Sequence, residues 1–120
     1  MMKDPTKCTV ARLHDAQVGD VVWVKPYEHR RERWRLKIIG EIGKQSIICE
    51  GSRAKYNNTN GAERATSWPE RLMGQLDKDD FLFMEHHQYK IGDKVSRLRD
   101  PALLRKVADL IGYDYQTTEN

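Results

Sequence analysis

The chain has 120 residues, of which 38% are hydrophobic and 32% are charged, with a formal net charge of +3 and a mean hydropathy of −0.80. This length predicts a single domain, residues 1–120, with one modest core. No apolar run approaches the ~20 residues that cross a bilayer, and Met1–Pro5 does not resemble a signal peptide. Two cysteines make no disulfide framework, so we expect a cytoplasmic protein without membrane contact.

Positive charge is concentrated in the first half of the chain. Residues 1–68 carry 13 Lys and Arg against 8 Asp and Glu, whereas residues 69–120 carry 8 against 10. Between residues 25 and 37 only Glu28 and Glu32 oppose six cations: Lys25, Arg30, Arg31, Arg33, Arg35 and Lys37. This basic cluster predicts long-range attraction to phosphate or to an acidic protein surface, and a solvated loop is the equally simple interpretation.

Residues 18–49 are typical of short strands. Residues 18–24 are rich in β-branched and aromatic side chains and end at Lys25-Pro26, which predicts a first strand and its stop. Residues 34–38 alternate apolar and basic side chains, which predicts a half-buried second strand with one polar face. Gly40 interrupts this alternation and indicates a bulge or sharp bend. A hairpin turn over 42–45 then leads into a strand at 46–49.

The next residues predict two more strands around a tight turn. Residues 53–57 form the fourth strand, and a fifth follows through Glu63, Ala65 and Ser67. Between them lies Asn57–Gly61, where Asn and Gly tolerate the positive φ of a tight hairpin. Five short strands bent at glycines favour a small closed barrel over an open sheet with exposed edges. We expect an SH3-like β-barrel.

Helical patterns dominate after residue 67. Ser67–Glu70 has the spacing of a capping box, which predicts a short helix with Leu72, Met73 and Leu76 on its apolar face. Asp77 is the expected N-cap of a longer helix, whose apolar positions follow a 3–4 spacing up to Leu98 and are interrupted by Gln88. A strand starting at Ile91–Val95 is the competing interpretation, and the helical period favours the helix.

A last helix begins at Asp100-Pro101 and ends at Gly112. Its apolar face could also serve as a homodimer contact, and residues 113–120 form a loose tail. The predicted fold is therefore α+β: an N-terminal barrel over residues 18–67, followed by two or three C-terminal helices over residues 68–112.

The order of these features resembles that of small phage and prophage β-barrel proteins with C-terminal helices. The resemblance covers residues 18–112 and rests on Gly19–Val24, the arginine-rich stretch, Ile38–Lys44 and Leu104–Gly112. The first strand is also similar to that of KOW and Tudor barrels. The resemblance implies a phage accessory protein in a bacterial host cytoplasm, and no catalytic residues carry over. Some small phage proteins inhibit host defence systems, as anti-CRISPR proteins do, by occupying a nucleic-acid enzyme.

Catalytic and metal-binding motifs are missing from the sequence. His86 and His87 point about 100° apart on a helix, and no Cys-x-x-Cys or His-x-x-x-His spacing accompanies them. Cys49 lies between apolar neighbours, as a packed thiol does. No phosphate-binding loop or nucleophile elbow is present. We therefore expect no enzyme activity, no metal and no cofactor.

Aromatic side chains accompany the basic cluster. Trp23 and Trp34 lie on predicted strands, where packing in the core is the favoured use, while Tyr27 and Trp68 have no such role. Arginine mixed with aromatics is typical both of protein-binding hot spots and of grooves on which bases stack. The candidate binding residues are Lys25, Tyr27, Arg30, Arg31, Arg33, Trp34, Arg35 and Lys37. The first hypothesis is stoichiometric binding to a host protein or nucleoprotein complex that handles nucleic acid, and the alternative is direct binding of DNA or RNA.

Overall fold

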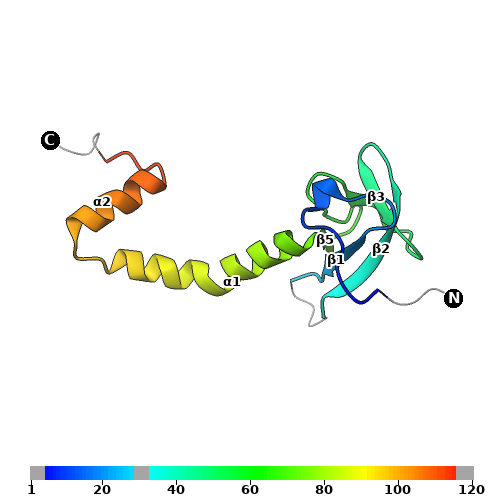
Figure 1. Ribbon diagram of the computed structural model, residues 1–120, viewed down its shortest axis with the longest axis horizontal. Coiled ribbons are helices and arrows are strands. Elements are labelled where there is room, and N and C mark those ends of the chain that lie inside the picture. The colour runs from blue at the N-terminus through cyan, green and yellow to red at the C-terminus, as the bar shows by residue number, and fades with distance from the viewer. Residues whose placement is uncertain (1–4, 29–32, 116–120) are drawn as a thin grey trace. The chain divides into compact units, whose positions relative to one another are not determined.

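The computed structural model describes residues 5–28 and 33–115, and the chain divides into two compact units, residues 1–82 and 83–120. The first unit contains a five-stranded antiparallel sheet that is bent into a nearly closed barrel (Figure 1). Two helices follow it along the chain, so the predicted α+β class is confirmed. Within the described ranges, no helix combines the length and the apolar character needed to cross a bilayer.

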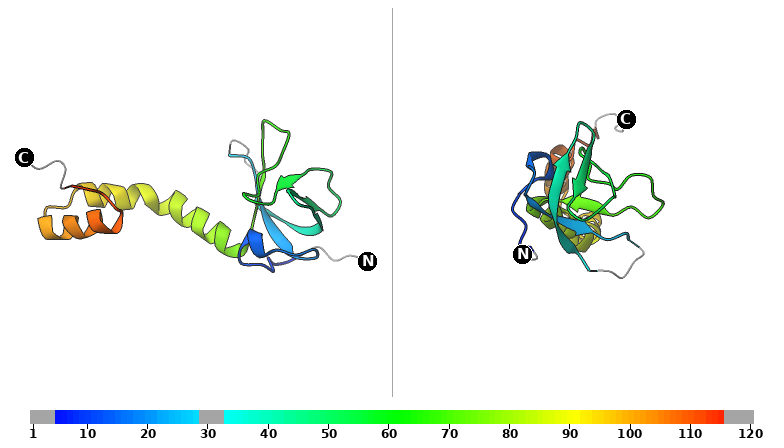
Figure 2. Two further views of the ribbon diagram at one scale, coloured as in Figure 1. Left: turned by 90° about the horizontal axis from the view of Figure 1, so that it is seen from above. Right: turned by 90° about the vertical axis from the view of Figure 1, so that its right-hand side faces the viewer.

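The sheet has the strand order β4-β3-β2-β1-β5, and its curl can be followed in Figure 2. A short 3-10 helix, Leu13–Asp15, precedes the strands. The elements are β1 Val21–Lys25, β2 Arg35–Ile42, β3 Ser46–Cys49, β4 Tyr56–Asn57, β5 Arg71–Met73, α1 Gln75–Ser96 and α2 Pro101–Leu110.

Two predicted bends in the sheet are confirmed. The register of β2 against β3 shifts between Ile39 and Glu41, which places a bulge at Gly40. The chain then reverses over residues 43–45, and the Gly43 amide donates to the Ser46 carbonyl at 2.8 Å. The bulge lies in β2 between the residues that pair with β1 and those that pair with β3, where a bend of the strand helps the sheet to curl.

The tight turn over Asn57–Gly61 closes the barrel. Gly61 has a φ of +74°, and its amide donates to the Asn57 carbonyl at 2.8 Å. Beyond the turn, Glu63 bridges to Tyr56 of β4 and Ala62 bridges to Arg71 of β5, so the two edge strands are joined through residues 62–63. A Cβ atom on Gly61 would lie 2.2 Å from the Leu72 carbonyl oxygen, which excludes any other residue there.

The predictions for residues 63–76 were wrong. A strand does not run through 63–67, because pairing there is limited to the bridges at Ala62 and Glu63. The short helix predicted after Ser67–Glu70 does not form at Leu72 and Met73, which belong to strand β5 and pair with Val24 and Trp23, whereas Leu76 belongs to α1. Leu72 and Met73 are buried in that register, and this burial outweighs the local capping signal.

The core of the barrel consists of side chains from every strand and from the 3-10 helix. They are Leu13, Val22, Val24, Ile39, Ile47, Cys49, Tyr56 and Leu72. Complete burial of each large apolar side chain stabilises the fold by about 1.5–3 kcal/mol. Cys49 is therefore a packed residue, and burial raises the pKa of its thiol while the charge of Lys37 partly opposes this.

Helix α1 is anchored to the barrel at its first turn. The amides of Gln75 and Leu76 donate to the carbonyls of Val10 and Ala11, both at 2.9 Å. The Asp77 carboxylate accepts from the Gly74 amide at 2.9 Å. These contacts satisfy amides that a helix N-terminus otherwise leaves unpaired. Asp77 thus occupies the third position of the helix and reaches back, rather than acting as the predicted N-cap.

The Asp77 carboxylate also binds the N-terminal segment. It accepts from the Leu13 amide at 2.8 Å, and the Arg12 guanidinium lies 3.1 Å from Asp77 and 2.6 Å from Asp80. Burial disfavours the ionised form of Asp77. The amides of Leu13 and Gly74 and the charge of Arg12 outweigh that effect and lower its pKa.

The long and the last helices are confirmed. Helix α1 continues through Gly92, so the competing strand at Ile91–Val95 is wrong. In α2, Asp100 accepts from the amides of Ala102 and Leu103, and Pro101 occupies the first turn. Gly112, with a φ of +73°, follows the end of the helix, as expected of a C-terminal stop.

We predict that Asp77→Asn destabilises the barrel at neutral pH by about 1–2 kcal/mol, because a charged acceptor is lost from two amides. Because the pKa of Asp77 is lowered in the folded state, the extra stability of the wild type is fully present above the unfolded-state pKa of about 3.9. It disappears as pH falls through the lower pKa of the folded state. Chemical unfolding between neutral and strongly acidic pH measures the difference. Asp79→Asn, at an exposed position, serves as the control. A stability difference between the wild type and Asp77→Asn that does not change with pH would contradict the role given to the Asp77 carboxylate.

Candidate functional site

The structure separates the predicted binding residues into three groups. Arg30 and Arg31 lie outside the described residues. Arg35, Lys37 and Lys25 belong to the strands, and Trp34 directly precedes β2. Tyr27 and the exposed Arg33 flank the undescribed part of the loop. The predicted cluster is therefore not one continuous surface among the described residues.

The basic residues of β2 lie on the same face of the sheet as two core valines of β1. Arg35 is opposite Val24 and Lys37 is opposite Val22 in the register, and cross-strand neighbours share a face of the sheet. Arg35 forms a salt bridge with Glu70, which precedes β5. One of the four predicted arginines thus has an internal carboxylate partner, although its side chain stays partly exposed.

The apolar residues of that region lie on the outer face, where helix α1 begins. Trp23 and Trp34 are half-buried and meet edge to face at 6.4 Å, and Phe81 of α1 lies 6.0 Å from Trp34. The Trp23 indole donates to the Gln75 side chain at 2.9 Å. The prediction that both tryptophans pack in the core needs correction, because they pack between sheet and helix instead.

Lysines cover this aromatic layer. The Lys78 ammonium lies 3.5 Å from the ring centre of Trp23 and 5.1 Å from that of Trp34. Lys25 lies 4.9 Å from the ring centre of Phe81. These cation–π contacts occupy ring faces that a stacked nucleobase would need.

A second aromatic pair joins Tyr27, one of the predicted binding residues, to Trp68, which lies on a loop that was not predicted to form a site. Tyr27 and Trp68 meet edge to face at 5.2 Å and 89°, and the Trp68 side chain is 56% exposed. The loop between Glu63 and β5 that carries Trp68 contains Ala65, whose φ of +58° is in the left-handed region. Such backbone strain in a non-glycine residue is concentrated at functional sites.

A pocket of about 220 Å³ adjoins this pair. Its lining mixes both charge signs with aromatic rings: Lys25, Tyr27, Glu28, Ala62, Pro69, Glu70, Arg71 and Phe81. Sites for drug-sized ligands usually measure 300–1,000 Å³. The pocket is therefore smaller than a typical site for a drug-sized ligand. We call Tyr27, Trp68 and this pocket the Trp68 site.

Below the site, Tyr56 is fully buried in the barrel. Among the described residues no group is within hydrogen-bond distance of its hydroxyl. Burial raises the pKa of Tyr56, and the carboxylates of Glu70 and Glu63 add to this effect. The hydroxyl therefore stays protonated at physiological pH, and complete burial keeps it from any ligand in the pocket.

Metal-binding groups do not assemble in the described parts of the chain, where no three His, Cys, Asp or Glu side chains lie close enough to hold an ion. The rings of His86 and His87 are 6.2 Å apart and perpendicular, and His87 packs on Phe83.

Comparison of the chain with protein families, curated proteins and solved structures found no match.

Sequence reasoning identified Tyr27 and Lys25 but missed Trp68, Glu70 and Phe81 as their neighbours. Trp68 lies 41 residues from Tyr27 in the sequence, and the contact exists only because β5 pairs with β1. The sequence signal for Trp68 was its position beside a proline, without an apolar pattern around it that would predict burial.

We predict that Ala65→Gly raises the free energy of unfolding by up to ~1 kcal/mol, because glycine adopts the left-handed conformation without a Cβ clash. Ala16→Gly is the matched control. Ala16 has an ordinary φ of −69°, so its replacement costs about 0.5–1 kcal/mol. Denaturant unfolding measures both variants. Equal losses of stability would show that the backbone at Ala65 is not strained.

Proposed function

We propose that this chain is a non-enzymatic binding module that captures a protein partner through the Trp68 site. The observation that carries the proposal is the exposed Trp68 ring, held edge to face against Tyr27 beside a pocket with charges of both signs. Tryptophan, tyrosine and arginine dominate the residues that contribute most to protein–protein binding, especially where a pocket accepts a partner side chain.

The strained loop supports this proposal. Holding Ala65 in the left-handed region costs about 1–2 kcal/mol, and the turn orders the backbone before Trp68. The Trp68 amide also donates to the Thr66 hydroxyl at 3.1 Å. A side chain ordered before binding loses less entropy when a partner arrives, which increases affinity.

Direct nucleic-acid binding receives less support. The ring faces of Trp23 and Trp34 are covered by Lys78, and Arg35 is paired with Glu70. These residues would otherwise provide the stacking surface and part of the phosphate contact. Exposed Arg33 and half-buried Lys37 remain candidates for a long-range attraction to nucleic-acid phosphates.

The finer parts of the proposal rest on the resemblance described above. We propose that the barrel is SH3-like, that the protein is a phage-type accessory factor, and that its partner is a host protein or nucleoprotein complex that handles nucleic acid. Inhibition of a defence enzyme by occupancy fits such a partner. The positive charge of residues 1–68 would bring an acidic surface toward the Trp68 site.

We predict that Trp68→Ala reduces capture of the partner at least tenfold without changing the unfolding midpoint, because an exposed hot-spot side chain is lost. Immobilised wild-type and variant chains are incubated with bacterial lysate, with and without nuclease, and bound proteins are quantified by mass spectrometry.

The matched control is Val18→Ala, which removes another exposed apolar side chain at 62% exposure. It should retain the proteins that the wild type captures. The proposal fails if Trp68→Ala captures the same proteins at the same yield, or if nuclease removes all of them.

We further predict that the purified chain has no measurable affinity for a short DNA or RNA at about 50 mM salt, where phosphate contacts are strong. Fluorescence anisotropy of a labelled oligonucleotide measures this. Micromolar binding that weakens steeply with salt and is lost in Arg33→Glu, but not in Lys55→Glu, would establish the nucleic-acid alternative instead.

A further inference from the structure

Residues 83–115 expose an unusual amount of apolar surface. None of these residues is buried. Of the 13 exposed large hydrophobic side chains among the described residues, nine belong to this part of the chain. A unit of 38 residues, 83–120, is also below the roughly 40 that fold alone without disulfides, metals or association.

The exposed residues of α1 follow a heptad pattern. Met84 and Ile91 are seven residues apart, as are Gln88 and Val95, so the four occupy alternating d and a positions. A stripe of this period is typical of a helix that packs lengthwise against another helix. Ile91 is 49% exposed, so the stripe is not covered at its centre.

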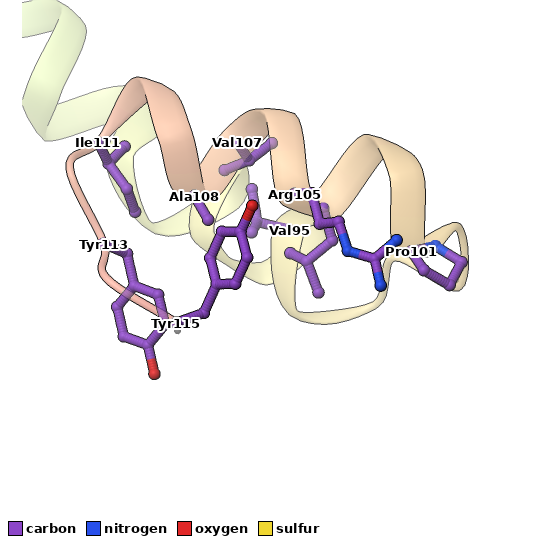
Figure 3. Close-up of a pocket in the computed structure, with 9 residues that line it drawn as sticks. Val95, Pro101, Arg105, Val107, Ala108, Ile111, Tyr113 and Tyr115 are labelled. Carbon is purple, nitrogen blue, oxygen red and sulfur yellow. The ribbon is translucent and has the colours of Figure 1, made fainter. Parts of the chain in front are cut away.

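Helix α2 adds apolar surface within the same unit. A groove of about 360 Å³ is lined by Val95 of α1, by Leu104, Val107 and Ala108 of α2, and by Ile111, Tyr113 and Tyr115 beyond it (Figure 3). Leu110 at the end of α2 is 85% exposed.

We infer that residues 83–115 pair with the same residues of a second copy of the chain. This inference is independent of the Trp68 site.

The exposed area suits a dimer. Seven apolar side chains lie on the α1 stripe, on α2 or at its end: Met84, Ile91, Leu103, Leu104, Leu110, Ile111 and Tyr113. They are 43–85% exposed, and at roughly 60–120 Å² of apolar area each they present on the order of 400–800 Å². Each partner of a standard stable complex buries about 800 Å².

The charges of this unit favour a second copy over an oppositely charged partner. Residues 83–120 contain six Lys and Arg and six Asp and Glu, so their net charge is zero. A two-fold interface places one surface against itself, which a neutral surface permits without repulsion. Helices that bind lipid surfaces instead carry an excess of Lys and Arg on their polar face.

Light scattering on the full chain at tens of micromolar tests this inference. We expect a mass of about 28 kDa, twice the 14.0 kDa of one chain. Ile91→Glu and Leu110→Glu should each reduce it to the monomer mass, with an unchanged circular dichroism spectrum. Tyr89→Glu, at an 84% exposed position away from the stripe, should remain a dimer.

A monomeric or larger wild-type mass would overturn the inference, as would equal disruption by Tyr89→Glu.

Discussion

The carboxylate of Asp77 is the contact on which the arrangement of the first unit depends. It receives hydrogen bonds from the amides of Leu13 and Gly74 and lies beside the Arg12 guanidinium. One side chain thereby joins the N-terminal segment, the end of β5 and the start of α1. The close approach at Gly74, where a Cβ atom would lie 2.3 Å from the Ala11 carbonyl oxygen, allows no larger residue at this junction.

This junction determines which aromatic side chains are covered. With α1 starting at Gln75, its first turns bring Lys78 and Phe81 onto Trp23 and Trp34. Two of the three tryptophans and their surrounding cations therefore stabilise the fold. Trp68, in contrast, lies outside this packing and stays exposed.

The sequence predicted elements well where one local pattern determined them. The bulge at Gly40, the turn at Asn57–Gly61 and the Asp100 cap depend on residues close to one another, and all three are confirmed. Residues 71–73 were predicted wrongly because a capping signal competed with pairing to β1, which is distant in the sequence. The Trp68 site was missed for the same reason, since Tyr27 and Trp68 meet only through that pairing. The face of the sheet on which Arg35 and Lys37 lie also depends on register, which alternation alone does not determine.

The joining of β4 to β5 through residues 62–63 has a consequence for how other proteins can recognise the barrel. Open sheets offer a row of unpaired backbone groups at which a foreign peptide adds as an extra strand, and the same edges promote aggregation. Here the bridges at Ala62 and Glu63 engage both terminal strands. Strand addition by main-chain pairing, whether by a foreign peptide or by another copy of the chain, is therefore blocked at these two positions.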